Sequence, residues 1–265
     1  MILIDSHCHP QLEQYNDDRE AMIKRSLDAE IGMIAIGTTL EDSIEGTRLA
    51  EKYPHDPIWA AVGVHPTDSD IADIHPAQLE ALLGSPKVVA IGETGLDYFH
   101  VTDPDQQDMQ SDVFEQHILL AKEKNLPLII HCRDKVGVYE AYDHIAVLLR
   151  RHQYSQFVMH CFSGRWKEAE MFLDLGGMIS FSGVITFPKS DEIQDVVRQV
   201  PAERYLIETD SPFLAPVPNR GKRNEPAYVQ HVAEMVAKLR NETVDEVALQ
   251  TLRSTQHFFR LPPSA

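Results

Sequence analysis

The sequence predicts an α/β protein that forms a single closed barrel of eight parallel strands, a (β/α)8 barrel. Eight short apolar runs alternate with helical patterns along the 265 residues. This alternation predicts parallel strands joined by right-handed crossover helices. Histidines and carboxylates follow runs at the beginning, middle and end of the chain. A closed ring brings such positions together at the C-terminal ends of its strands, which predicts the location of a site.

The eight predicted strands are short runs rich in aliphatic residues, bounded by polar or turn-forming residues. They comprise residues 2–5, 33–37, 58–64, 88–91, 126–130, 156–159, 178–181 and 204–207. A doubly wound open sheet would satisfy the same alternation. However, the first run is not followed by the Gly-x-Gly-x-x-Gly turn of dinucleotide-binding sheets, so we favour the closed barrel.

The segments between the runs carry helix signals. Asp17 with Glu20, and Thr243 with Glu246, have the spacing of capping boxes at helix N-termini. Helices are expected over residues 75–83, 105–124, 136–152, 166–175 and 226–239, and from Thr243 to residue 259. Nothing resembles a linker or a repeat, so we expect one domain over residues 1–261 and a short tail over 262–265.

The composition is that of an ordinary globular protein, with 43% hydrophobic and 25% charged residues. No apolar stretch approaches the roughly 20 residues that a membrane span needs, and the N-terminus lacks the features of a signal peptide. Three cysteines without framework spacing argue against a disulfide-stabilised secreted domain. We therefore expect a cytoplasmic protein with no membrane partner and no obligatory protein partner.

The net charge of -17 disfavours partners that are bound by broad electrostatic attraction, such as long duplex DNA or an anionic membrane. An anionic substrate would need local positive charge. Divalent cations could supply it, together with a basic cluster in the Pro/Gly-rich loop after the last predicted strand. This cluster comprises Arg220, Lys222 and Arg223.

Six residues at the ends of predicted strands have side chains that can ligate metals. They are His7, His9, Glu93, His131, His160 and Asp210. His7 and His9 are two residues apart, so on a strand both point to the same face. Barrel closure would place Asp210 beside them. We therefore expect one metal site from His7, His9, Glu93 and Asp210, and a second from Glu93, His131 and His160.

Two cations that share Glu93 can hold a hydroxide between them and stabilise both oxygens of an in-line displacement, so hydrolysis is the expected reaction. Asp210 is the candidate to orient the nucleophile and accept its proton. Imidazole-rich shells suit Zn²⁺ or Mn²⁺, whereas a phosphoryl substrate favours Mg²⁺.

Cys8, Cys132 and Cys161 each follow a candidate histidine directly. Strand alternation predicts that their thiols turn away from the metals, into the layer between barrel and helices.

Seven segments of the chain resemble, in order, the signature segments of the TatD family of metal-dependent deoxyribonucleases. They are IDSHCH (4–9), GVHP (63–66), IGETGLDY (91–98), HCR (131–133), HCFSG (160–164), ETDSP (208–212) and RNEP (223–226). The resemblance covers essentially the whole chain. It implies a TIM barrel of the amidohydrolase superfamily that hydrolyses DNA, typically as a 3′ to 5′ exonuclease, and it carries metal ligation over to the six residues named above.

Several further residues are candidate substrate contacts. His65 could bind a phosphate or cap a turn, and Arg133 could bind a phosphate or pair with a nearby aspartate such as Asp134 or Asp97. Lys222 and Arg223 could reach substrate phosphates on the rim. Tyr98, Phe162 and Phe213 follow ligand-bearing strands, where an aromatic ring can stack on a base or simply pack its own loop.

Two other functions remain open from the sequence. The same hydroxide could attack a carbonyl, as in a carboxyl-ester or amide hydrolase such as a D-aminoacyl-tRNA deacylase. A non-enzymatic metal-binding scaffold is disfavoured because all six ligand-type residues are present. The small basic surface favours short single-stranded DNA ends over long duplex.

Overall fold

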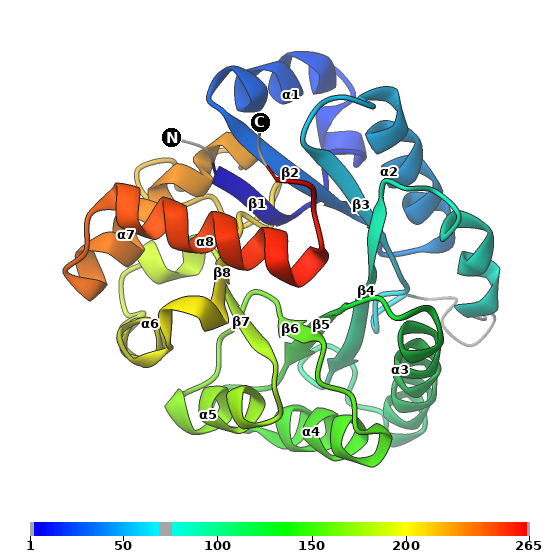
Figure 1. Ribbon diagram of the computed structural model, residues 1–265. Helices are drawn as coiled ribbons and strands as arrows, with labels where there is room; N and C mark the ends of the chain where they lie inside the picture. Colours follow the sequence, from blue (N-terminus) through cyan, green and yellow to red (C-terminus); the bar gives the residue numbers. More distant parts are fainter. Residues whose placement is uncertain (1–2, 69–75, 264–265) are drawn as a thin grey trace.

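Eight parallel strands form a ring in the order of the sequence in the computed structural model, which describes residues 3–68 and 76–263. The helices lie on the outside of this ring (Figure 1). The strands are β1 (Leu3–Cys8), β2 (Ile31–Ile36), β3 (Ile58–Val62), β4 (Val88–Asp97), β5 (Leu128–Arg133), β6 (Phe157–Met159), β7 (Met178–Phe181) and β8 (Tyr205–Ile207). The predicted (β/α)8 barrel is confirmed.

Eight α-helices and several short 3-10 helices connect the described strands. The α-helices are α1 (Arg19–Asp28), α2 (Leu40–Lys52), α3 (Pro104–Lys124), α4 (Glu140–His152), α5 (Trp166–Asp174), α6 (Asp191–Gln199), α7 (Val229–Arg240) and α8 (Val244–Phe259). The 3-10 helices are η1 (Glu13–Tyr15), η2 (Pro76–Leu82), η3 (Gly183–Thr186), η4 (Ala202–Arg204) and η5 (Pro226–Tyr228). Within the described residues, no helix is both long enough and apolar enough to span a bilayer.

Backbone contacts just beyond the end of β8 close the ring onto β1. The amide of Asp210 donates to the carbonyl of His7 (2.9 Å), and the amide of His9 donates to the carbonyl of Ser211 (2.7 Å). Cys8 and Ser211 form a parallel bridge. Closure therefore fixes Asp210 beside the two histidines of β1.

The hydrophobic core has two layers because successive residues of a strand face opposite sides. One layer packs the outer strand faces against the helices, with residues such as Met33, Phe114 and Ile145. The second cluster joins Ile34, Ile129 and other strand residues of the opposite face to Phe259 at the end of α8 and to Leu261 beyond it. This apolar filling leaves the polar residues at the C-terminal strand ends.

Three of the predicted ligands lie inside strands, whereas the sequence predicted all six at strand ends. His7, Glu93 and His131 are within β1, β4 and β5, and the registers of β1 and β4 shift at these positions. Gly92 has a φ of 138°, and a Cβ there would lie 2.5 Å from the carbonyl oxygen of Ile129. This irregularity of β4 requires glycine and sets the position of Glu93.

The two predicted capping boxes have different outcomes. Thr243 and Glu246 form theirs, since each backbone amide donates to the other side chain, at 2.8 and 3.2 Å. The box predicted from Asp17 and Glu20 is wrong. Asp18 is the N-cap residue of α1 and makes no side-chain cap bond, because its carboxylate binds the guanidinium groups of Arg25 and Arg223.

Two predicted helices begin or form differently. The helix predicted over 136–152 starts only at Glu140, after Gly137 adopts a φ of 81°. The helix predicted over 75–83 is the 3-10 helix η2. Its predicted first residue, His75, lies outside the described residues, as do residue 2 of the first predicted strand and residues 264–265 of the tail.

We predict that His117 of α3 contributes to acid sensitivity. The side chain is fully buried, Nδ1 donates to the carbonyl of Val113 (2.7 Å), and burial lowers the pKa to about 4. An unfolded histidine titrates near pH 6.5, so between pH 6.5 and 4 only the unfolded chain gains the proton. The free energy of unfolding should therefore fall by about 2–3 kcal/mol across this window because of this residue.

Denaturant unfolding of the wild type and His117→Gln at pH 7 and pH 4.5 checks this expectation. The wild type should lose more stability than the variant on acidification. His55→Gln, which changes an exposed histidine, is the matched control. A difference between wild type and His117→Gln that does not vary with pH would contradict the prediction.

Candidate metal centre

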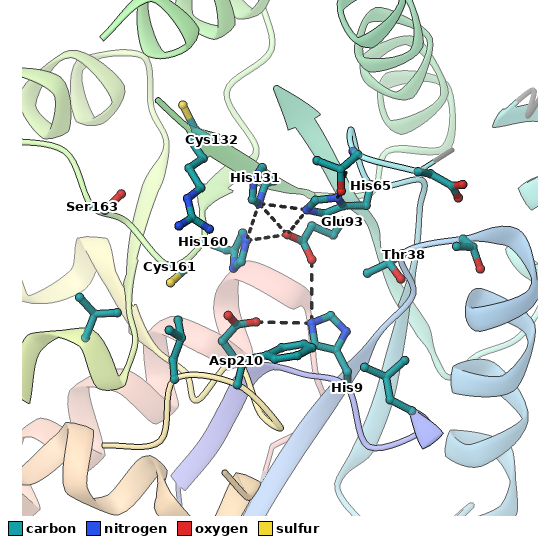
Figure 2. Close-up of a pocket in the computed structure, with 18 residues that line it drawn as sticks. His9, Thr38, His65, Glu93, His131, Cys132, His160, Cys161, Ser163 and Asp210 are labelled. Atoms are coloured by element: carbon teal, nitrogen blue, oxygen red, sulfur yellow. Dashed lines mark hydrogen bonds and ion pairs between the residues drawn. The ribbon is translucent and has the colours of Figure 1, made fainter. Parts of the chain in front are cut away.

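A cavity of about 730 Å³ opens at the C-terminal ends of the strands and contains most of the predicted site residues (Figure 2). His9, Glu93, His131, His160 and Asp210 line it, together with His65 and Arg133. His7 is fully buried next to this group, and its ring stacks on that of His160 with 3.9 Å between centroids. The fold therefore brings all six predicted ligands together.

The two carboxylate oxygens of Glu93 face two different groups of imidazoles. Oε2 lies 3.3 Å from His7 Nε2 and 3.9 Å from His9 Nε2. Oε1 lies 2.9 Å from His131 Nδ1 and 2.7 Å from His160 Nε2. Glu93 therefore lies between two pairs of imidazoles, one pair facing each carboxylate oxygen.

Asp210 completes the first group. Its Oδ1 lies 3.4 Å from His9 Nε2 and 3.8 Å from His7 Nε2. Burial opposes ionisation of Asp210, but the hydrogen bond from His9 and the charges of His7 and His160 hold its pKa below the usual range. The carboxylate is therefore ionised at neutral pH.

In three of the imidazoles, the ring nitrogen that faces away from Glu93, here called the outer nitrogen, makes a hydrogen bond. This bond fixes which nitrogen faces the centre. His9, His131 and His160 donate these hydrogens to the carbonyl of Ile36 (2.9 Å), to Asp97 (3.1 Å) and to Glu208 (3.3 Å). Such outer partners orient metal-ligating histidines and select their tautomer. The inner nitrogen of each neutral ring therefore points a lone pair at the centre.

A lone pair that faces a carboxylate oxygen at 2.7–2.9 Å needs a positive charge between them. Burial opposes protonation of His160 and His131, yet the neighbouring carboxylates, Glu93 among them, raise the pKa of both rings, that of His160 well above its usual range. Burial likewise opposes the charge of Glu93, but the surrounding imidazoles hold its pKa well below normal. The centre thus favours bound cations.

His7 provides a second indication that the residues fit a metal. Neither of its ring nitrogens has a hydrogen-bond partner in the described part of the chain, although the ring is fully buried. A buried imidazole without partners is costly. A metal ion bound to Nε2 would satisfy that nitrogen, and imidazole and carboxylate are ligands that divalent transition metals accept.

His65 lies against the second group, but its inward-facing nitrogen carries a hydrogen rather than a lone pair. Its Nε2 is 3.4 Å from Glu93 Oε1 and 3.2 Å from His131 Nδ1. Its Nδ1 accepts a hydrogen bond from the backbone amide of Thr67 (3.2 Å), so in the neutral ring Nε2 carries the hydrogen. Burial and the charge of His131 lower the pKa of His65, which keeps it neutral. This geometry suits a hydrogen-bond donor better than a ligand.

The predicted basic contacts separate into two kinds. Arg133 lines the cavity, is exposed, and packs its guanidinium 4.5 Å from the centroid of the Phe99 ring; none of the ion pairs among the described residues involves it. Arg223 instead binds Asp18 (2.7 Å) and Glu225 (3.3 Å). Lys222 is exposed and, like Arg223, is not among the cavity-lining residues.

The prediction for the cysteines holds for Cys8 but not for Cys161. Cys8 packs in the layer between barrel and helices. Cys161 lines the cavity, and its thiol contacts the hydroxyl of Ser182 (3.2 Å). Cys161 lies beyond the end of β6 and has a positive φ of 42°, so strand alternation does not apply to it. Cys132 packs partly against the same core layer as Cys8 and also lines the cavity.

Two buried carboxylates that the sequence analysis did not assign support the site. Asp97 binds His131, and Glu208 binds His160, the amide of Cys161 (2.6 Å) and the hydroxyl of Ser180. Both are acidic residues at the ends of apolar strands. That placement was a usable signal, because a carboxylate there requires a partner.

Comparisons with known proteins agree with this geometry. The model of the family described as TatD related DNase matches residues 4–260. The uncharacterized metal-dependent hydrolase YabD of Bacillus subtilis is 38% identical over 98% of this chain and 100% of its own length. The 3′-5′ ssDNA/RNA exonuclease TatD of Erwinia tasmaniensis is 35% identical over 94% of this chain and 96% of its own.

A solved structure, that of the TatD homologue YjjV from Escherichia coli, superposes with a TM-score of 0.86. It is 33% identical in sequence, and the match covers 98% of both chains. The family match extends over nearly the whole barrel and includes every residue of the candidate metal centre. This chain therefore belongs to the TatD family of metal-dependent hydrolases.

Proposed function

We propose that this protein is a deoxyribonuclease that hydrolyses phosphodiester bonds at single-stranded DNA ends, with 3′ to 5′ polarity. The observation that carries the proposal is the division of the Glu93 carboxylate between two imidazole groups at the base of an open cavity. The family description and the name of the Erwinia relative support DNA as substrate and 3′ to 5′ polarity.

Two divalent cations, Mg²⁺, Mn²⁺ or Zn²⁺, would fit the centre. The first would be held by His7, His9, Glu93 and Asp210. The second would be held by Glu93, His131 and His160. When bound, such cations activate water and stabilise the negative charge that develops on the entering and leaving oxygens of an in-line phosphoryl displacement.

Three side chains that line the cavity have further roles in this proposal. Asp210 lines the cavity and is ionised, so it orients the attacking water and accepts its proton. His65 directs its Nε2 hydrogen toward the second group, where it can donate to a phosphate oxygen. The guanidinium of Arg133 lies at the cavity wall and has no carboxylate partner among the described residues, which suits a second phosphate oxygen.

We predict that Asp210→Asn lowers kcat for a labelled single-stranded oligonucleotide by about 10²- to 10⁴-fold, because the base is lost. Glu93→Ala should abolish the reaction. An aminoacyl-tRNA assay run in parallel separates the rival hydrolase class. Deacylation without any nuclease activity would contradict the proposal, as would full nuclease activity in both variants.

We also predict that Glu93→Ala removes more metal than His9→Ala, since Glu93 faces both groups and His9 only one. Elemental analysis after extensive dialysis measures the effect, and circular dichroism confirms folding. Glu115→Gln, which changes a carboxylate paired with His152 away from the cavity, is the control. Equal metal loss in the Glu93 and His9 variants would argue against a shared carboxylate.

Arg133 and Lys222 should differ in their dependence on substrate length. Arg133→Ala should raise KM for a dinucleotide and for a long oligonucleotide, and should reduce the salt slope by about one. Lys222→Ala should raise KM only for the long strand, because Lys222 lies outside the cavity lining. An equal rise in KM for the dinucleotide and the long oligonucleotide in Lys222→Ala would be inconsistent with this placement.

A further inference from the structure

The cavity has an apolar side that neither the metal ligands nor the core explains. Four side chains form it: Leu12, Val184, Phe213 and Leu214, here called the apolar wall. None of them packs against a hydrophobic core cluster in the described residues. Phe213 is 48% exposed. Apolar groups left open to water beside a charged centre indicate a ligand surface.

The residues of the apolar wall come from three loops that lie close together. The amide of Leu12 donates to the carbonyl of His9 (3.2 Å), and the His9 ring lies 6.2 Å from the Phe213 ring. On the other side, a Cβ on Gly183, the neighbour of Val184, would lie 2.3 Å from the carbonyl oxygen of Leu214. The loops after β1, β7 and β8 thus meet beside the first group of ligands.

Hydrogen bonds hold the backbone of Phe213 in a defined place. Its amide donates to the carbonyl of Asp210 (2.9 Å), and its carbonyl accepts from the side chain of Asn224 (2.6 Å). Asn224 is fully buried and also donates to the carbonyl of Thr209 (2.9 Å). The backbone that carries this exposed ring is therefore held close to Asp210, which lowers the entropy cost of ordering the loop when a partner binds.

The other two aromatic candidates do not offer a free face. Phe162 is 3% exposed and belongs to the core, and Tyr98 packs against the same core and binds His144 (2.6 Å). Phe213 alone among the three lines the cavity.

We propose that the apolar wall is a nucleobase subsite, on which the base of the terminal nucleotide stacks against Phe213 while its phosphodiester lies at the metal ligands. This inference rests on the proposed function. A base has an apolar face for the ring and polar edges, which the hydroxyls of Thr38 and Thr39 in the same cavity can meet. Stacking tolerates every base, so the subsite favours a nucleotide without selecting its sequence.

The charge of the chain gives this subsite a specific role. With a net charge of -17, the protein gains little from broad attraction to DNA. A neutral stacking contact adds affinity without basic surface. It can act only on an unpaired base, and this requirement favours single-stranded ends over duplex.

The test compares two oligonucleotides that differ only in whether the terminal residue carries its base or is abasic. In the wild-type holoenzyme, loss of the base should raise KM about tenfold with little change in kcat. Phe213→Ala should have the same KM for both oligonucleotides, and Phe213→Trp should keep the lower KM for the one that carries its terminal base. Val217→Ala, which changes a similarly exposed residue of the same loop outside the cavity lining, is the control and should also keep it.

Binding of dTMP and of 2-deoxyribose 5-phosphate, measured by calorimetry on the holoenzyme, gives a readout independent of turnover. The wild type should bind dTMP about tenfold more tightly, and Phe213→Ala should bind both alike. Equal binding by the wild type, or a preference that survives in Phe213→Ala, would overturn the subsite alone. Failure of the holoenzyme to hydrolyse either oligonucleotide would instead overturn the proposed function.

Discussion

The ionised carboxylate of Glu93 is the interaction on which the site depends. Its charge is buried, and burial alone would neutralise it. Imidazoles that arrive from β1, β5 and the segments after β3 and β6 offset that cost. Only a closed ring of strands places these elements around one side chain of β4. The charge of Glu93 therefore depends on the closed barrel, and a bound cation would stabilise both the carboxylate and the imidazoles around it.

The rigidity of the centre comes from partners that lie behind the ligands. Asp97 and Glu208 hold His131 and His160 by their outer nitrogens, and a backbone carbonyl holds His9. The backbone of β8 is hydrogen-bonded to β1 beside Asp210. Because these partners select the tautomers, the inner nitrogens direct their lone pairs toward the two oxygens of Glu93. The centre is organised before any substrate enters the cavity.

Under the proposed function, the surroundings of the centre account for how an acidic protein would bind an anionic polymer. Arg133 lines the cavity and forms no ion pair with another described residue, whereas Arg223 is ion-paired with Asp18 and Glu225. The ion pairs of Arg223 tie the loop after β8 to α1. That loop also presents Phe213 to the cavity. In the proposed function, bound cations and the apolar wall would hold the substrate in place of a broad basic surface.

The sequence by itself determined the barrel, the order of its strands and the six ligand-type residues, because the C-terminal ends of parallel strands must converge in a closed ring. Only the tertiary structure decided which oxygen of Glu93 meets which imidazole, and that Asp97 and Glu208 are the outer partners. It also decided that Arg223 is ion-paired, that Cys161 faces the cavity, and that Phe213 rather than Phe162 offers a free ring. These outcomes depend on distances between loops and on local irregularities such as Gly92. Periodicity in a sequence predicts which face of a helix or strand a residue occupies, but it does not identify the distant side chain that the residue contacts.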